Sequence, residues 1–306
     1  MAPTPTQSSQ LVNPLATTAQ LSSSGSQLDG VPADLEDSIR FAGASLTQVA
    51  GMLLRLPQEI IARAIILFTR FWVGPEGGSL IEYGTEIVSA SSLYLIAKLS
   101  PYPKSPRQIL TTYAYLSSLP MTLLTSSLFS SKVPESPDAY YLSEGTYLSQ
   151  RVTLMKTESH ILRVLGFDTH VALPYTLCVN YLQTLDVFQH PQASALAKRA
   201  FAHLNTSLLS PQLLYLTHQP PALATAAIYL AAREVGVKLP DNEWWEVFDT
   251  DREELGFLVV GLLSTEAFVK GEEERWGEGK GRGKAPMTVE AVEAEVERRR
   301  ILEGGG

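Results

Sequence analysis

The chain has very little cysteine and histidine, the residues on which metal sites and many nucleophilic sites depend. It contains one cysteine, Cys178, among 306 residues, so no internal disulfide is possible. A lone buried thiol fits a reducing compartment. None of the five histidines forms an H-E-x-x-H pair or a Cys/His cluster: His160, His170, His190, His203 and His218. No metal site is therefore predicted, and we interpret His160, Glu158 and Asp168 as charges around a helix end rather than as an acid/base group.

Excess positive charge and long apolar runs are also missing. The formal net charge is −8 and the pI is about 5.2, which disfavours a general electrostatic surface for nucleic acid. The most apolar stretch, 60–72, contains two arginines and is shorter than the ~20 residues that span a bilayer. No Gly-x4-Gly-Lys-Ser/Thr loop occurs, and the glycine-rich run 277–284 is interpreted as a linker. The sequence predicts a globular protein without a transmembrane segment.

The first 32 residues are rich in Ser, Thr, Gln and Pro and lack the charged start and apolar core of a signal peptide. We expect a disordered tail over 1–32. Apolar spacing and Gly/Pro punctuation then predict five helices in 33–170, with a Ser/Pro-rich surface loop at 117–142 before the last. Their expected ranges are 35–56, 57–72, 80–98, 106–116 and 143–165.

The second half, 171–270, repeats this order of elements. The predicted helices are 174–187, 191–209, 221–235, 242–248 and 251–269. The segments Leu93–Lys98 and Ile228–Arg233 share a pattern and a place within each half, which an internal duplication explains; chance similarity of two buried helices is the alternative. The sequence thus predicts an all-α fold of two tandem five-helix units. A charged, Gly-rich linker and a short helix that begins near Thr288 are expected in 271–306.

Four segments in order carry a family resemblance: Gly51–Gln58, Leu67–Phe71, Leu95–Lys98 and Glu158–Phe167. Together they resemble the cyclin box of the transcriptional cyclins, above all the cyclin L group. The similarity covers about residues 33–269. A tryptophan pair, Trp244-Trp245, is similar to the cyclin M group and leaves the subfamily open.

This resemblance implies a non-catalytic regulatory subunit that binds and activates a transcription-type cyclin-dependent kinase, in RNA polymerase II transcription or RNA processing. It implies a kinase-facing pair, Lys98 at the end of the third helix and Glu158 in the fifth, with apolar contact from Leu95 and Leu99. It further implies a nuclear location. No cofactor and no membrane partner are expected, because the sequence contains no cofactor-binding motif and no transmembrane segment. Direct nucleic-acid binding is not expected. For Lys98 and Glu158 the alternative is an ordinary helix-end lysine and a solvated carboxylate.

The sequence also departs from the family pattern. Acidic residues usually follow the third-helix lysine, whereas this chain has Leu99-Ser100-Pro101, which leaves the identity of the kinase open. The first helix lacks the substrate-docking patch of cell-cycle cyclins, and no Arg/Ser-rich tail is present. A competing hypothesis is a cyclin-fold adaptor or transcription factor without a kinase partner; a helical enzyme has no motif in its favour.

Overall fold

The computed structural model describes residues 12–118, 140–276 and 285–304, and within these ranges it is all-helical, as predicted. The chain divides into two compact units. The N-terminal unit comprises 16–169 and 267–306, and the C-terminal unit comprises 1–15 and 170–266. Of the three boundaries along the chain, the last, between residues 266 and 267, falls within one long helix, α13 (Arg252–Trp276).

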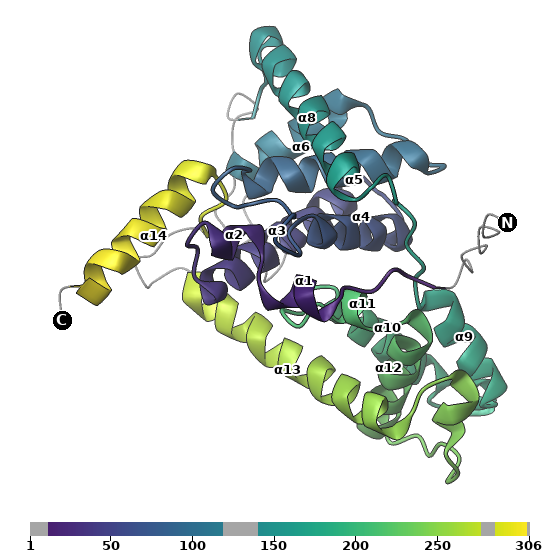
Figure 1. The fold of residues 1–306 in the computed structure, drawn as a ribbon. Helices are drawn as coiled ribbons and strands as arrows, with labels where there is room; N and C mark the ends of the chain where they lie inside the picture. Colours follow the sequence, from purple (N-terminus) through teal and green to yellow (C-terminus); the bar gives the residue numbers. More distant parts are fainter. Residues whose placement is uncertain (1–11, 119–139, 277–284, 305–306) are drawn as a thin grey trace, which may run out of the picture. The chain divides into compact units, whose positions relative to one another are not determined.

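The N-terminal unit is built on five helices, of which α5 packs against each of the other four (Figure 1). They are α3 (Ala33–Leu53), α4 (Gln58–Phe71), α5 (Thr85–Leu99), α6 (Pro106–Ser118) and α8 (Glu144–Val164). Helix α4 is apolar around most of its circumference, and Ile61, Ile65, Leu67 and Phe68 are all fully buried. A helix that is apolar on several sides needs neighbours on several sides, and α3 and α5 both pack on α4.

Helix α5 is also buried on several sides, but through small residues. Ser89, Ala90, Ser91 and Ser92 are buried, and their small side chains let α3, α4 and α8 approach α5 closely. The buried hydroxyl groups need partners, since an unpaired buried polar group is costly. Ser89 meets that need in a short chain of hydroxyls, 2.6 Å from Thr47 of α3 and 2.6 Å from Tyr113 of α6.

The C-terminal unit places α12 (Pro220–Val235) against α10 (Ala193–Ser207) and α9 (Tyr175–Thr184). Helix α12 begins with two prolines and ends at Gly236, which adopts a left-handed conformation with φ 78°. The remaining elements are α11 (Leu214–Thr217), the 3-10 helices η2 (Val187–Gln189) and η3 (Trp244–Phe248), and the first part of α13. Here η3 replaces the α-helix that the sequence predicted at 242–248.

The described part of the expected tail, 12–32, is folded rather than disordered. It contains α1 (Thr18–Ser22) and α2 (Gly25–Leu28). Thr17 caps α1, and its backbone N–H donates to the Gln20 side chain at 2.9 Å. Asn13 is buried within the C-terminal unit, where its side chain bonds both backbone groups of Ala172. The prediction was wrong here because Ser, Thr, Asn and Gln also cap helices and bond to backbone groups. Composition alone does not distinguish these roles from disorder.

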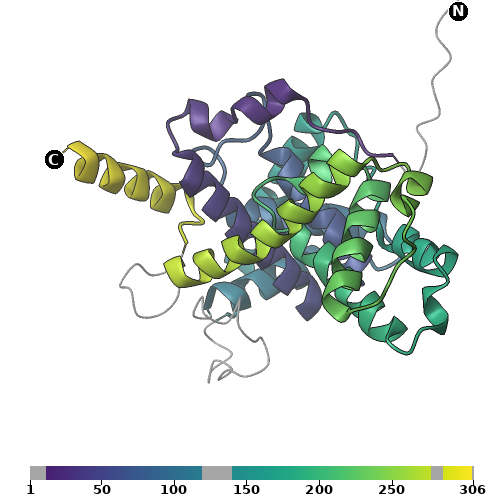
Figure 2. The same cartoon turned by 90° about the horizontal axis from the view of Figure 1, so that it is seen from below.

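The expected linker after residue 270 also begins later than predicted. Helix α13 continues to Trp276, because Glu272 and Trp276 bond to Ser38 of α3. The glycine-rich run 277–284 and most of the predicted loop, 119–139, lie outside the described residues. The predicted C-terminal helix is present as α14 (Val289–Gly304), which buries Val292 and Val296. It projects from this unit with its C-terminal end outermost (Figure 1 and Figure 2).

Candidate functional site

The C-terminal end of α5 is shaped by the residues that stop the helix. Pro101 cannot continue it, and Ser100 closes it in an extended conformation, with φ −101° and ψ 168°. The Ser100 backbone N–H and hydroxyl both donate to the carbonyl oxygen of Ala97, at 3.1 and 2.8 Å. The hydroxyl in turn accepts from the Tyr102 N–H at 3.0 Å. These hydrogen bonds give partners to backbone groups at the exposed C-terminal end of α5. They stabilise its last turn, which carries Lys98 and Leu99.

Lys98 and Glu158 form an ion pair between α5 and α8. The side chain of Glu158 is 8% exposed and that of Lys98 is 46% exposed, so the carboxylate is nearly buried and the ammonium faces solvent. The ammonium also lies 5.4 Å from the ring centroid of Tyr94, one turn earlier on α5. The sequence prediction that these two residues meet agrees with the structure. The ammonium retains donors for a further acceptor, because one carboxylate oxygen uses only part of its capacity.

The two apolar side chains predicted to contact a partner, Leu95 and Leu99, differ in their exposure to solvent. Leu99 is 61% exposed, and Tyr102, just beyond the helix, is 50% exposed. Leu95 is 2% exposed and belongs to the core of the unit. The prediction that Leu95 offers surface to a partner therefore disagrees with this structure. Tyr102 takes its place as the second exposed apolar side chain, and the exposed Ser-Pro-Tyr-Pro turn is the signal in the sequence that could have found it.

His160, on α8, belongs to an aromatic cluster. It stacks on Tyr83 at 4.7 Å and meets the edge of Phe71 at 5.9 Å, measured between ring centroids. His160 therefore packs as an aromatic ring in this unit, which the interpretation as one of several charges around a helix end did not anticipate. Across the described ranges no group of three or more His, Cys, Asp or Glu side chains is arranged to hold a metal ion. No described helix combines the length and the apolarity needed to cross a membrane.

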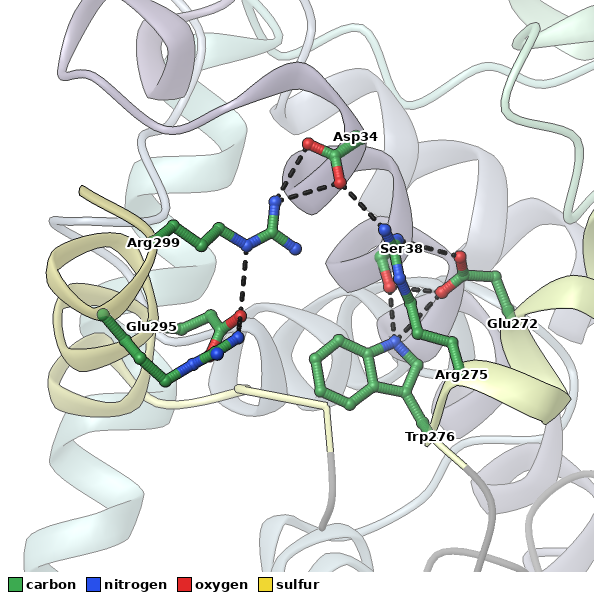
Figure 3. A network of polar contacts seen from close by, with 8 residues as sticks. Asp34, Ser38, Glu272, Arg275, Trp276, Glu295 and Arg299 are labelled. Carbon is green, nitrogen blue, oxygen red and sulfur yellow. Dashed lines mark hydrogen bonds and ion pairs between the residues drawn. The ribbon is translucent and has the colours of Figure 1, made fainter. Parts of the chain in front are cut away.

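A second polar network in the N-terminal unit was not anticipated from the sequence (Figure 3). Asp34, in the first turn of α3, accepts hydrogen bonds from Arg275 of α13 and Arg299 of α14, each at 2.9 Å. Burial acts to raise the pKa of Asp34, but the hydrogen bonds and charges of Arg299 and Arg275 together lower it below its usual value. Beside it, the Trp276 indole N–H donates to Ser38 at 2.6 Å. The network fastens the end of α13 and α14 to α3.

The C-terminal unit holds a network of its own on α10, α12 and α13. Arg199 donates to Glu234 at 2.5 Å and to Glu266 at 2.8 Å. The fully buried His203 lies 2.8 Å from Glu234. Hydrogen bonding from Arg199, opposed by burial and aided by His203, lowers the pKa of Glu234 to about 2. This arrangement links the three helices through shared ion pairs, which favours a structural role.

The fold resembles solved structures of low sequence identity. One chain of the crystal structure of the yeast RNA Pol II CTD kinase CTDK-1 complex superimposes with a TM-score of 0.64 at 13% identity, covering 94% of this chain and 84% of that one. A chain of the CAK complex from Chaetomium thermophilum bound to ATP-γ-S gives 0.53 at 16% identity, covering 88% and 78%. These likenesses establish the fold. No family model matches the sequence.

The sequence comparisons decide the family. Cyclin-L1-1 of Arabidopsis thaliana is 33% identical over 238 residues, covering 76% of this chain and 51% of the relative. Cyclin-L1 of Homo sapiens is 30% identical over 245 residues, covering 80% and 43%. The chain belongs to the cyclin family. Its similarity is to the L-type cyclins, and it spans about half the length of the curated relatives it matches.

Proposed function

We propose that this cyclin is a regulatory subunit that binds and activates a cyclin-dependent kinase in RNA polymerase II transcription or RNA processing, in the nucleus. The observation that carries the proposal is the Lys98–Glu158 ion pair, formed at the exposed end of α5 beside the exposed Leu99 and Tyr102. The names of its relatives, Cyclin-L1-1 and Cyclin-L1, and the kinase complexes in which its structural neighbours were solved support the same partner class.

The geometry suits a positioning role better than a large gain in affinity. Glu158 is held nearly buried by α8 and fixes the ammonium of Lys98, whose remaining donors face solvent. Such a pre-oriented cation can bind carbonyl oxygens at the end of a partner helix with little loss of side-chain entropy. Leu99 and Tyr102 add apolar area beside it. The polar pair therefore sets the orientation of the kinase, and the apolar side chains contribute contact energy.

Activation in this scheme is a shift of population in the kinase. Phosphoryl transfer requires the strand lysine and the αC glutamate of the kinase to pair and its activation loop to be ordered. A subunit that binds this arrangement more tightly than the inactive one stabilises it by the difference in binding free energy. The reacting groups belong to the kinase, and Lys98 and Glu158 act by placing it.

The test is affinity capture of the tagged chain from its own cells, with the co-purified kinases identified and their activity measured. The variant is Lys98→Glu combined with Glu158→Lys, which keeps the charges of the pair but exchanges their places. The control is Lys238→Asp combined with Asp241→Lys, an exposed ion pair of the C-terminal unit with a separation of 2.9 Å. We expect wild type and control to capture a cyclin-dependent kinase and its activity, and the Lys98/Glu158 variant to lose both.

Two results would contradict the proposal in different ways. If wild type captures no cyclin-dependent kinase, the kinase-regulator function is wrong and the adaptor hypothesis gains support. If the Lys98/Glu158 variant captures as much kinase as wild type, the function stands and the site is elsewhere. Circular dichroism and the thermal midpoint of each variant, measured in parallel, show whether the helices remain folded.

A further inference from the structure

The connection between α5 and α6 carries two Ser-Pro dipeptides only five residues apart, Ser100-Pro101 and Ser105-Pro106. Residues 100–105 are not helical, and Pro101, Tyr102 and Pro103 are exposed. A residue before proline favours an extended backbone, and Ser100 already has one. Ser100 is half-buried and Ser105 is exposed. Ser-Pro in an extended segment at the surface is the substrate pattern of proline-directed serine/threonine kinases.

The two serines occupy opposite ends of helices. Ser100 lies at the C-terminus of α5, where its hydroxyl donates to the carbonyl oxygen of Ala97 at 2.8 Å. Ser105 precedes the N-terminus of α6, where its hydroxyl accepts from the Gln108 N–H at 3.2 Å. A phosphate is unfavourable at a helix C-terminus and favourable at an N-terminus, because the helix dipole is negative at the first and positive at the second. The same modification therefore has opposite consequences at these two positions.

We propose that Ser100 is a phosphorylation site for a proline-directed kinase, and that its phosphorylation loosens the last turn of α5 and so weakens binding of the partner kinase. The second half of this inference rests on the function proposed above, since the last turn carries Lys98 and Leu99.

The chemistry at Ser100 is ordinary phosphoryl transfer from MgATP. The Ser100 oxygen bonds to the γ-phosphorus as the bond from that phosphorus to the β,γ-bridging oxygen breaks, the hydroxyl proton passes to the catalytic aspartate of the modifying kinase, and ADP leaves. Once esterified, the oxygen no longer has a proton to donate to Ala97. Nearly two negative charges then lie beside the negative end of α5.

The first experiment needs no partner. The purified full chain is incubated with MgATP and a purified proline-directed mitogen-activated protein kinase, and the sites are mapped by mass spectrometry in wild type, Ser100→Ala and Ser105→Ala. Hydrogen exchange is then followed in the last turn of α5. We expect phosphate at Ser100 in wild type and Ser105→Ala, with exchange of that turn about tenfold faster than in unmodified protein, from the lost bond and the dipole. Absence of phosphate from Ser100 in the folded chain, or unchanged exchange when it is present, overturns the proposal.

The second experiment measures the regulatory consequence by capture from the chain's own cells. Ser100→Glu is compared with Ser105→Glu, which places the same charge at a helix N-terminus five residues away. We expect Ser100→Glu to lower the captured cyclin-dependent kinase activity about tenfold and Ser105→Glu to leave it unchanged. Equal activity in the two variants refutes the regulatory role. Absence of any such kinase from wild type refutes the proposed function instead, while mapping and hydrogen exchange still decide the modification and its local effect.

Discussion

Replacing Gly43 by alanine tests whether the close packing of α3 holds the helix that carries Lys98. Gly43 lies in the middle of α3, and a Cβ there would lie 2.4 Å from Cζ of Phe68 and 2.4 Å from Cγ2 of Thr85. Both neighbours are almost completely buried, at 0% and 1% exposure, so neither can move aside into solvent. Such overpacking typically costs about 1–3 kcal/mol, and two severe contacts place this case near the upper figure.

Alanine also gains helix propensity relative to glycine, about 1 kcal/mol in a helix interior. The net expectation for Gly43→Ala is therefore a loss of about 2 kcal/mol from the free energy of unfolding. A loss of this size lowers the thermal midpoint of a unit of this length by about 4–8 °C.

The matched control is Gly271→Ala in α13, where a Cβ would meet nothing within 4 Å. Only the gain in helix propensity applies at Gly271, so Gly271→Ala should raise the thermal midpoint by about 2–4 °C. Both positions belong to the N-terminal unit, so differential scanning calorimetry reads the same transition in each. If Gly43→Ala proves as stable as wild type, or the two substitutions shift the midpoint in the same direction, the packing argument is refuted.

Three further predictions concern polar and ionisable side chains. Ser38→Ala should cost about 1–3 kcal/mol by chemical denaturation, because Ser38 is the hydroxyl partner of the nearly buried Glu272, and an unchanged stability would show that another group replaces it. Because the pKa of Glu234 is lowered from 4.5 to about 2, wild type should lose stability as the pH falls through that window; Glu234→Gln, titrated by thermal unfolding, should lose less over the same window, and an equal loss would contradict this contribution. Burial raises the pKa of Cys178 to about 12, so iodoacetamide should label it only after denaturation, and rapid labelling of the native chain would contradict its burial.

Part of the candidate site could be predicted from the sequence, and part could not. Lys98 and Glu158 were placed together by family resemblance, and the structure pairs them. Leu95 and Leu99, four residues apart, share one face of α5, yet one is buried and the other exposed. Spacing assigns residues to a face of a helix but does not say how far along that face the neighbouring helices reach.

The sequence by itself determined the longer helices and most of their ends, because these depend on local interactions. Pro101 and the capping hydroxyl of Ser100 stop α5 whatever the rest of the chain does. Only the tertiary structure decided that Asp34 serves as an anchor for the end of the chain. Its partner Arg299 is 265 residues away, and no local pattern records a contact between side chains so distant in sequence. Such contacts follow from the packing of whole helices, which is settled only when their apolar faces are buried together.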